Sequence, residues 1–154
     1  MSTVHRRCRA SREDVWAVLA DPWLYASWVV GASRIRDVTG EWPAREALIH
    51  HSVGLWPLLL DDNTSVTESD PGHELHLRAR GRPLGEAEVQ LSLQGEGPEC
   101  TVTMSEWAVS GPGSKLPRPV FDAVVSWRNT ESLRRLALIA QGRHEPAQPG
   151  RPSR

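Results

Sequence analysis

The chain has 154 residues, of which 39% are hydrophobic and 24% charged, and its formal net charge is −1 at pH 7. This length suits one domain, the composition is typical of a soluble globular protein, and the near-neutral charge gives no reason to expect nucleic acid or an anionic membrane as a partner. No run approaches the roughly 20 apolar residues that span a bilayer, and Met1–Arg7 lacks the apolar core of a signal peptide, so we expect a cytoplasmic protein without an integral membrane segment.

The first part of the chain predicts a strand followed by two helices. Residues Thr3–Arg9 alternate in polarity and indicate a short strand. Ser11 then has the character of a helix N-cap, with Asp14 three residues later in the position of a capping-box acid. A second short helix is expected over Pro22–Trp28, because a proline in the first turn of a helix costs little.

The middle of the chain predicts an antiparallel sheet. Short runs alternate apolar with polar residues and are joined by turns rich in Gly and Pro. The clearest run places Ala87, Val89, Leu91 and Leu93 on one face. Connections this short leave no room for parallel crossovers. The six predicted strands are Ser33–Val38, Ala47–Val53, Leu58–Ser69, Glu74–Arg80, Glu86–Gln94 and Glu99–Val109.

The last predicted element is a long amphipathic helix over Pro119–Gln141, ended by Gly142. Its helical projection separates one broad apolar side from a charged side that carries Arg128. We expect one domain over residues 1–142, followed by a disordered Pro- and Arg-rich tail over residues 143–154. The apolar side consists of Phe121, Val125, Asn129, Ser132, Leu133, Leu136, Ile139 and Ala140.

Six consecutive strands and one long helix bury both apolar faces best if the sheet curls around the helix. The predicted fold is therefore α+β, a helix-grip fold with a curved antiparallel sheet of about seven strands around the C-terminal helix, and two short helices after strand 1.

Three segments also resemble a known superfamily. Ser11–Pro22, followed by Tyr25 and Trp28, is similar to the opening helix pair of the SRPBCC superfamily, and Arg128–Leu136 resembles its closing helix. Asp70–Leu75 is similar to the turn into its central strands. The superfamily includes START domains, the major birch pollen allergen and the polyketide cyclase/dehydrase family. The resemblance covers about Val4–Arg143 and implies a cavity for lipids, sterols or polyketides, without implying one reaction.

Motifs for metal, nucleophilic or phosphate chemistry are absent from the sequence. The adjacent His50 and His51 would point to opposite faces of a strand, and no H-E-x-x-H, G-x-S-x-G or phosphate-binding loop occurs. We therefore expect no metal and no cofactor. Cys8 and Cys100 are read as isolated thiols, since their spacing supports neither a disulfide nor a reactive thiol.

Polar residues on predicted inward faces are the candidates for ligand contact. Glu106 shares a strand face with Met104; it is either an inward carboxylate able to act as acid or anchor, or a hydrated group at the rim. His51 would either orient a ligand carbonyl or pack as a histidine bonded to backbone. Asn129, in the middle of the last helix, needs a partner, either a ligand or a sheet carbonyl.

Tryptophan is abundant, with seven residues against one Tyr and one Phe. Such rings either line a cavity mouth or are scattered in ordinary packing. Val120, Val124 and Trp127 form a small stripe on the charged side of the last helix, which either lines the mouth or meets a partner subunit. The candidate ligand-binding residues are His51, Met104, Glu106, Val125, Asn129, Leu133, Trp28, Trp42 and Trp56.

Three functional hypotheses follow. The first is a carrier or sensor that binds a small hydrophobic molecule, lipid or polyketide-like, in an internal cavity. The second is an enzyme of the polyketide cyclase/aromatase type, in which His51, Glu106 or Asn129 transfers protons. The third is a protein-partner module that acts through its surface stripe. A monomer and a homodimer are both compatible with the sequence.

Overall fold

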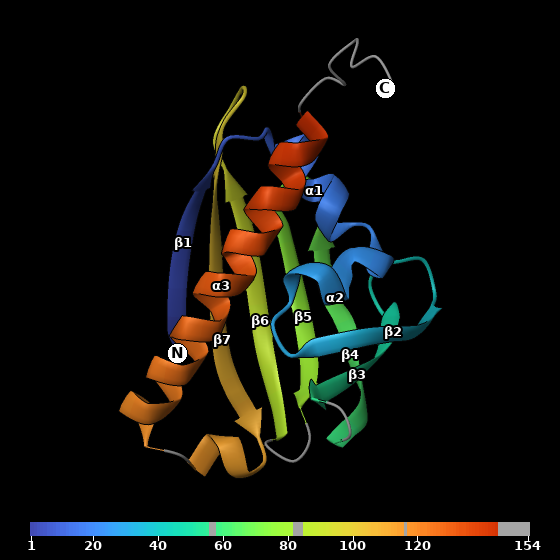
Figure 1. Ribbon diagram of the computed structural model, residues 1–154, viewed down its shortest axis with the longest axis vertical. Coiled ribbons are helices and arrows are strands. Elements are labelled where there is room, and N and C mark those ends of the chain that lie inside the picture. The colour runs from blue at the N-terminus through green and yellow to red at the C-terminus, as the bar shows by residue number, and fades with distance from the viewer. Residues whose placement is uncertain (56–57, 82–84, 116, 145–154) are drawn as a thin grey trace, which may run out of the picture.

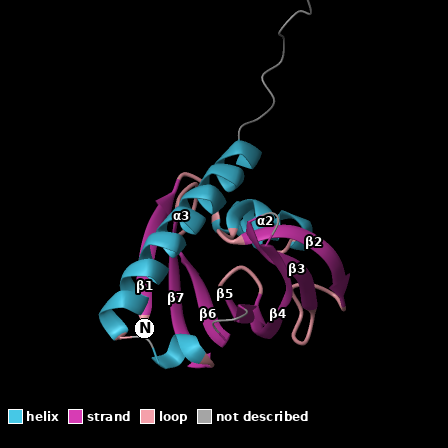
Figure 2. Cartoon of the chain, turned by 60° about the horizontal axis from the view of Figure 1, so that its bottom comes forward, coloured by secondary structure: helices cyan, strands magenta, loops and turns pink. Residues whose placement is uncertain are grey.

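The structure is a computed structural model that describes residues 1–55, 58–81, 85–115 and 117–144. Its described strands form one antiparallel sheet in the order β1-β7-β6-β5-β4-β3-β2, which curves around the long helix α3, while α1 and α2 lie beside that helix (Figures 1 and 2). The predicted α+β helix-grip fold is therefore confirmed. The elements are β1 (Ser2–Cys8), α1 (Arg12–Leu19), a 3-10 turn (Pro22–Leu24), α2 (Tyr25–Trp28), β2 (Ala32–Thr39), β3 (Leu48–Leu55), β4 (Leu58–Asp70), β5 (Glu74–Gly81), β6 (Gly85–Gln94), β7 (Cys100–Ser110), a second 3-10 turn (Pro112–Lys115) and α3 (Arg118–His144).

The predicted capping box begins α1. The Asp14 backbone N–H donates to the Ser11 hydroxyl at 3.1 Å, and the Ser11 N–H donates to the Asp14 carboxylate at 3.3 Å. The second predicted helix is divided into a 3-10 turn and the four-residue α2. This turn has its own cap, because the Asp21 side chain accepts from the Trp23 N–H at 3.0 Å.

Side-chain size falls steadily along the inner face of the sheet. Across β5, β6 and β7, the register aligns Leu75, Leu91 and Met104 in one row, and Ala79, Ala87 and Ala108 in another nearer the ends of β5 and β7. Beyond the alanines, Gly81 pairs with Gly85. The large residues fill the core, whereas the small ones leave space above them.

Helix α3 packs over both the large and the small side chains on the inner face of the sheet. Its C-terminal half contributes Leu133, Leu136, Ala137 and Ala140 to the core, each at most 1% exposed. The predicted end of the helix at Gln141 is wrong by three residues, because α3 runs on through Gly142 to His144. Gly142 does not adopt the positive φ with which a glycine ends a helix. Of the predicted tail, residues 145–154 lie outside the described residues.

The two cysteines are neighbours in space. Cys8 of β1 pairs directly with Cys100 of β7, and both are buried free thiols, so the prediction of isolated thiols is wrong about their surroundings. The strands that bring them together lie 92 positions apart in the chain, which conceals the pairing in the sequence. Burial raises the pKa of both thiols, that of Cys100 to about 11. In the described ranges, no helix combines the length and apolar character needed to cross a membrane.

Candidate functional site

A cavity of about 290 Å³ lies between the first half of α3, the segment from α2 into β2, and the sheet. This volume is at the lower end of the roughly 300–1,000 Å³ of small-molecule pockets. Its apolar walls include Val29, Val53, Leu77, Val89 and Val125. The cavity reaches the surface, because Val120 and Val124 line it and are 52% and 61% exposed.

The row of alanines explains why a cavity exists at this end of the molecule. The cavity is lined by Ala79, Ala87 and Ala108. Each of these side chains is smaller than the one found one or two rows away on the same strand. Gly85 is needed beside them. Its φ is +113°, and a Cβ there would lie 2.0 Å from the Ser110 carbonyl oxygen, so only glycine fits this close approach.

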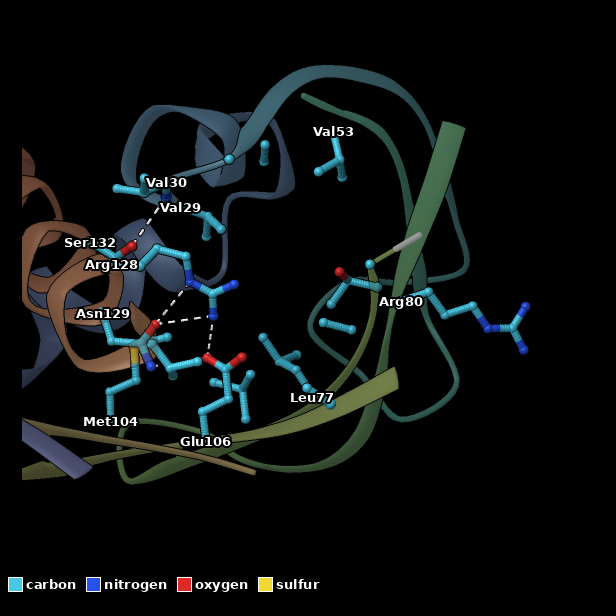
Figure 3. Close-up of a pocket in the computed structure, with 18 of the residues that line it drawn as sticks. Val29, Val30, Val53, Leu77, Arg80, Met104, Glu106, Arg128, Asn129 and Ser132 are labelled. Carbon is cyan, nitrogen blue, oxygen red and sulfur yellow. Dashed lines mark hydrogen bonds and ion pairs between the residues drawn. The ribbon is translucent and has the colours of Figure 1, made fainter. Parts of the chain in front are cut away.

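One polar cluster joins the sheet to the long helix (Figure 3). The Asn129 amide donates to Glu106 Oε2 at 2.9 Å, and the Arg128 guanidinium forms an ion pair with the same carboxylate oxygen. Arg128 also donates to the Asn129 carbonyl oxygen through two nitrogens, at 3.2 and 3.3 Å. The three side chains form a closed triangle in which Glu106 and Asn129 are buried.

A second polar cluster lies on the α2 and β3–β4 side of the cavity. The Thr64 hydroxyl is 3.0 Å from both the Tyr25 hydroxyl and Nε2 of His51, so it links these two groups by hydrogen bonds. The Tyr25 and His51 rings also lie close, with centroids 5.5 Å apart. Nδ1 of His51 is buried and forms no hydrogen bond with the described residues. The polar atoms at this site are therefore held in fixed positions by one another.

Burial keeps the second cluster uncharged. It lowers the pKa of His51, which the charge of Asp62 partly offsets, and it raises the pKa of Tyr25. The charges of Arg128 and Glu106 also act on Tyr25, in opposite directions. The two clusters are thus near enough to share one electrostatic environment.

Six of the nine candidate ligand-binding residues line the cavity. Leu133 instead lies in the core at 1% exposure. Trp42 packs against Tyr25, and its indole N–H donates to the Leu19 carbonyl oxygen at 2.9 Å. Trp56 lies outside the described residues. The six that line the cavity are Trp28, His51, Met104, Glu106, Val125 and Asn129.

The partners of these residues differ from those expected. Glu106 is 3% exposed, so the reading as a hydrated rim group is wrong. The Asn129 amide donates to the Glu106 carboxylate in place of the sheet carbonyl that was one alternative, and contact with a ligand stays a prediction. His51 bonds through Nε2 to the Thr64 hydroxyl, and the backbone of Ser52 also acts on its pKa.

Sequence reasoning missed several polar residues of the cavity, among them Tyr25, Thr64 and Arg128. Helical projection assigned Arg128 to the charged side, but its long side chain turns back to Glu106, leaving the guanidinium and stem 36% exposed. Thr64 lies two positions before the buried Val66 on β4 and therefore shares its inward face, and this spacing is the signal that would have revealed it.

The predicted surface stripe is divided between two roles. Val120 and Val124 belong to the cavity rim, whereas Trp127 is 69% exposed and is absent from the lining. Among the residues that the structure describes, no three His, Cys, Asp or Glu side chains gather in a way that would hold a metal ion.

Comparison with known proteins places this site in context. Residues 2–141 match the model of the family described as polyketide cyclase / dehydrase and lipid transport. A comparison with curated proteins returned no match.

Solved structures share the fold at low sequence identity. An aromatase/cyclase from Streptomyces sp. R1128, ZhuI, is 16% identical with a TM-score of 0.67, over 95% of this chain and 96% of that chain. A conserved protein from Geobacillus kaustophilus is 17% identical with a TM-score of 0.68, over 93% and 96%. DynU16, encoded in the dynemicin biosynthetic locus, is 20% identical with a TM-score of 0.64, over 91% of this chain and 46% of that one.

Proposed function

We propose that this chain, which belongs to the polyketide cyclase / dehydrase and lipid transport family, binds a small hydrophobic molecule, lipid or polyketide-like, as a carrier or sensor. The internal cavity would hold this molecule. The observation that carries the proposal is the row of Ala79, Ala87 and Ala108 beneath α3. Small side chains at three cross-strand positions forgo packing that larger residues would supply. An apolar space kept open in this way suits a ligand that fills it.

The first test is native mass spectrometry of the purified protein, followed by denaturation and extraction of any bound molecule. A co-purifying apolar compound would support the proposal and identify its class. A protein that purifies empty and also binds no member of a panel of fluorescent lipids and polyketide-like aromatics would contradict it.

Two variants separate cavity binding from adsorption to the surface. Ala108→Trp fills the cavity from the sheet, whereas Ala44→Trp adds the same side chain at an exposed position outside the lining. We expect the first to weaken binding at least about tenfold, a loss of about 1.4 kcal/mol, and the second to leave it unchanged. Equal affinities in both variants would place the ligand elsewhere.

A second candidate function, a polyketide cyclase/aromatase-type enzyme, is favoured by one specific observation. Glu106 and Asn129 meet at 2.9 Å on the cavity wall, so a substrate bound there would lie near a carboxylate for proton transfer and an amide for hydrogen bonding. His51 belongs to the other cluster and would act from the opposite side. The test is turnover of a poly-ketone substrate by the wild type and by Glu106→Gln. A turnover rate that the substitution leaves unchanged would argue against this role for Glu106.

A further inference from the structure

We propose that the cavity selects compact, uncharged ligands that carry a hydroxyl or carbonyl group, and discriminates against carboxylates and ammonium ions. This inference rests on the proposed ligand-binding function and adds the chemical class of the ligand. It follows from how the charged and polar side chains around the cavity are paired.

The described ionic groups that line the cavity cancel one another. Arg128 pairs with Glu106, and Arg80 pairs with Glu86 at 2.9 Å. In Figure 3 the Arg80 side chain points away from the other labelled residues, so only the first pair faces the ligand space. The remaining titratable groups on the inner wall, His51 and Tyr25, are neutral at neutral pH, because burial lowers the pKa of His51 and raises that of Tyr25. The described lining therefore carries no net charge.

A charged ligand would disturb this balance. A carboxylate would approach Glu106 and the field of the buried Asp62, which also acts on His51 and Tyr25. An ammonium ion would approach Arg128. In either case the ligand would lose its hydration without gaining an unshared counter-charge, and such burial is costly.

The paired groups still offer hydrogen bonds to a neutral ligand. Within the described part of the chain, Arg128 bonds through Nε and Nη2 only, and its other terminal nitrogen carries no dashed line in Figure 3. Glu106 receives both of its bonds from the described residues on Oε2. One donor on Arg128 and one acceptor on Glu106 thus remain for a ligand. A hydroxyl group can bond to either, and a carbonyl group to the donor.

The test compares three probes with the same ring system: 2-naphthol, 2-naphthoate and 2-naphthylmethylammonium. Their affinities for the wild-type protein are measured by isothermal titration calorimetry at neutral pH. We expect 2-naphthol to bind at least about tenfold more tightly than either ion. Equal or tighter binding of an ion overturns the selectivity but leaves ligand binding intact. Failure of all three probes to bind overturns the inference that the cavity takes compact ligands of this class, whereas the proposed ligand binding is decided separately by the mass spectrometry and the lipid panel.

Charge variants test the cause of the selectivity. Glu106→Gln leaves Arg128 uncompensated and should raise the affinity for 2-naphthoate relative to 2-naphthol at least about tenfold. Arg128→Gln should do the same for the ammonium probe. Glu99→Gln, in the exposed ion pair with Arg7 outside the cavity lining, is the matched control and should change neither ratio. If Glu106→Gln and Arg128→Gln both leave the ratio of ion affinity to 2-naphthol affinity unchanged, the role of the inward pair is refuted.

Discussion

Separate removal of the two partners of the Arg128–Glu106 pair should destabilise the protein to different degrees. Arg128→Met removes the cation and keeps a side chain of similar length. Glu106→Gln removes the negative charge and keeps the shape. Both substitutions break the same ion pair, but they leave different charged groups behind.

The difference follows from exposure. The Glu106 side chain is 4% exposed, so after Arg128→Met its carboxylate stays buried with one remaining bond, from Asn129 at 2.9 Å. Loss of the partner of a buried charge costs about 3–5 kcal/mol. The Arg128 side chain is 36% exposed and can turn to water after Glu106→Gln, while the new amide still accepts a hydrogen bond. We expect about 1–2 kcal/mol for this loss.

The free energy of unfolding of wild type, both single variants and the double variant is measured by urea denaturation at neutral pH. The double variant should be more stable than Arg128→Met alone, because no uncompensated buried carboxylate remains. If Glu106→Gln costs as much as Arg128→Met, the asymmetry of burial does not control the energetics and the reasoning is refuted.

Three further predictions concern other groups. Burial lowers the pKa of His51, so the contribution of the neutral imidazole to stability is present above the ordinary pKa of about 6.5 and is lost as the pH falls below it. In thermal melts between about pH 7.5 and pH 5.5, His51→Gln should therefore lose less stability than the wild type. Equal losses in the two proteins would refute this. The raised pKa of the Cys100 thiol, about 11, predicts that the native protein reacts slowly with a disulfide reagent at about pH 8 and quickly only when denatured, so fast native labelling would contradict the buried site. Gly85→Ala should cost about 1–3 kcal/mol by thermal unfolding, through strain and the contact with Ser110. Gly97→Ala, also at positive φ but with open space around it, is the control and should cost less.

Local patterns predicted most of the fold. The Ser11 cap, the alternation along β6 and the apolar side of α3 each depend on residues a few positions apart, and all three were read correctly. The order of these elements then left one economical way to bury their apolar faces. The strand bounds shifted by at most two residues, the second predicted helix was divided, and α3 ran past Gly142, which kept a helical backbone.

The site was less predictable because its contacts join distant parts of the chain. Asn129 and Glu106 were both identified as inward polar residues, but their bond depends on the height at which α3 crosses β7. Arg128 was missed because projection of a helix places Cα atoms and takes no account of the reach of a long side chain. The link from Tyr25 to Thr64 spans 39 positions and has no local pattern.

The falling side-chain size along the inner sheet separates the part of the molecule that forms the core from the part that shapes the cavity. Substitution of Leu75 or Leu91 would damage the core, whereas exchange of Ala79, Ala87 or Ala108 for a slightly larger residue would mainly reshape the cavity. Three positions, one on each of three neighbouring strands, therefore act as an adjustable floor. Under the proposed binding function, we expect single mutations at this floor to change the preferred ligand without a compensating change in the core.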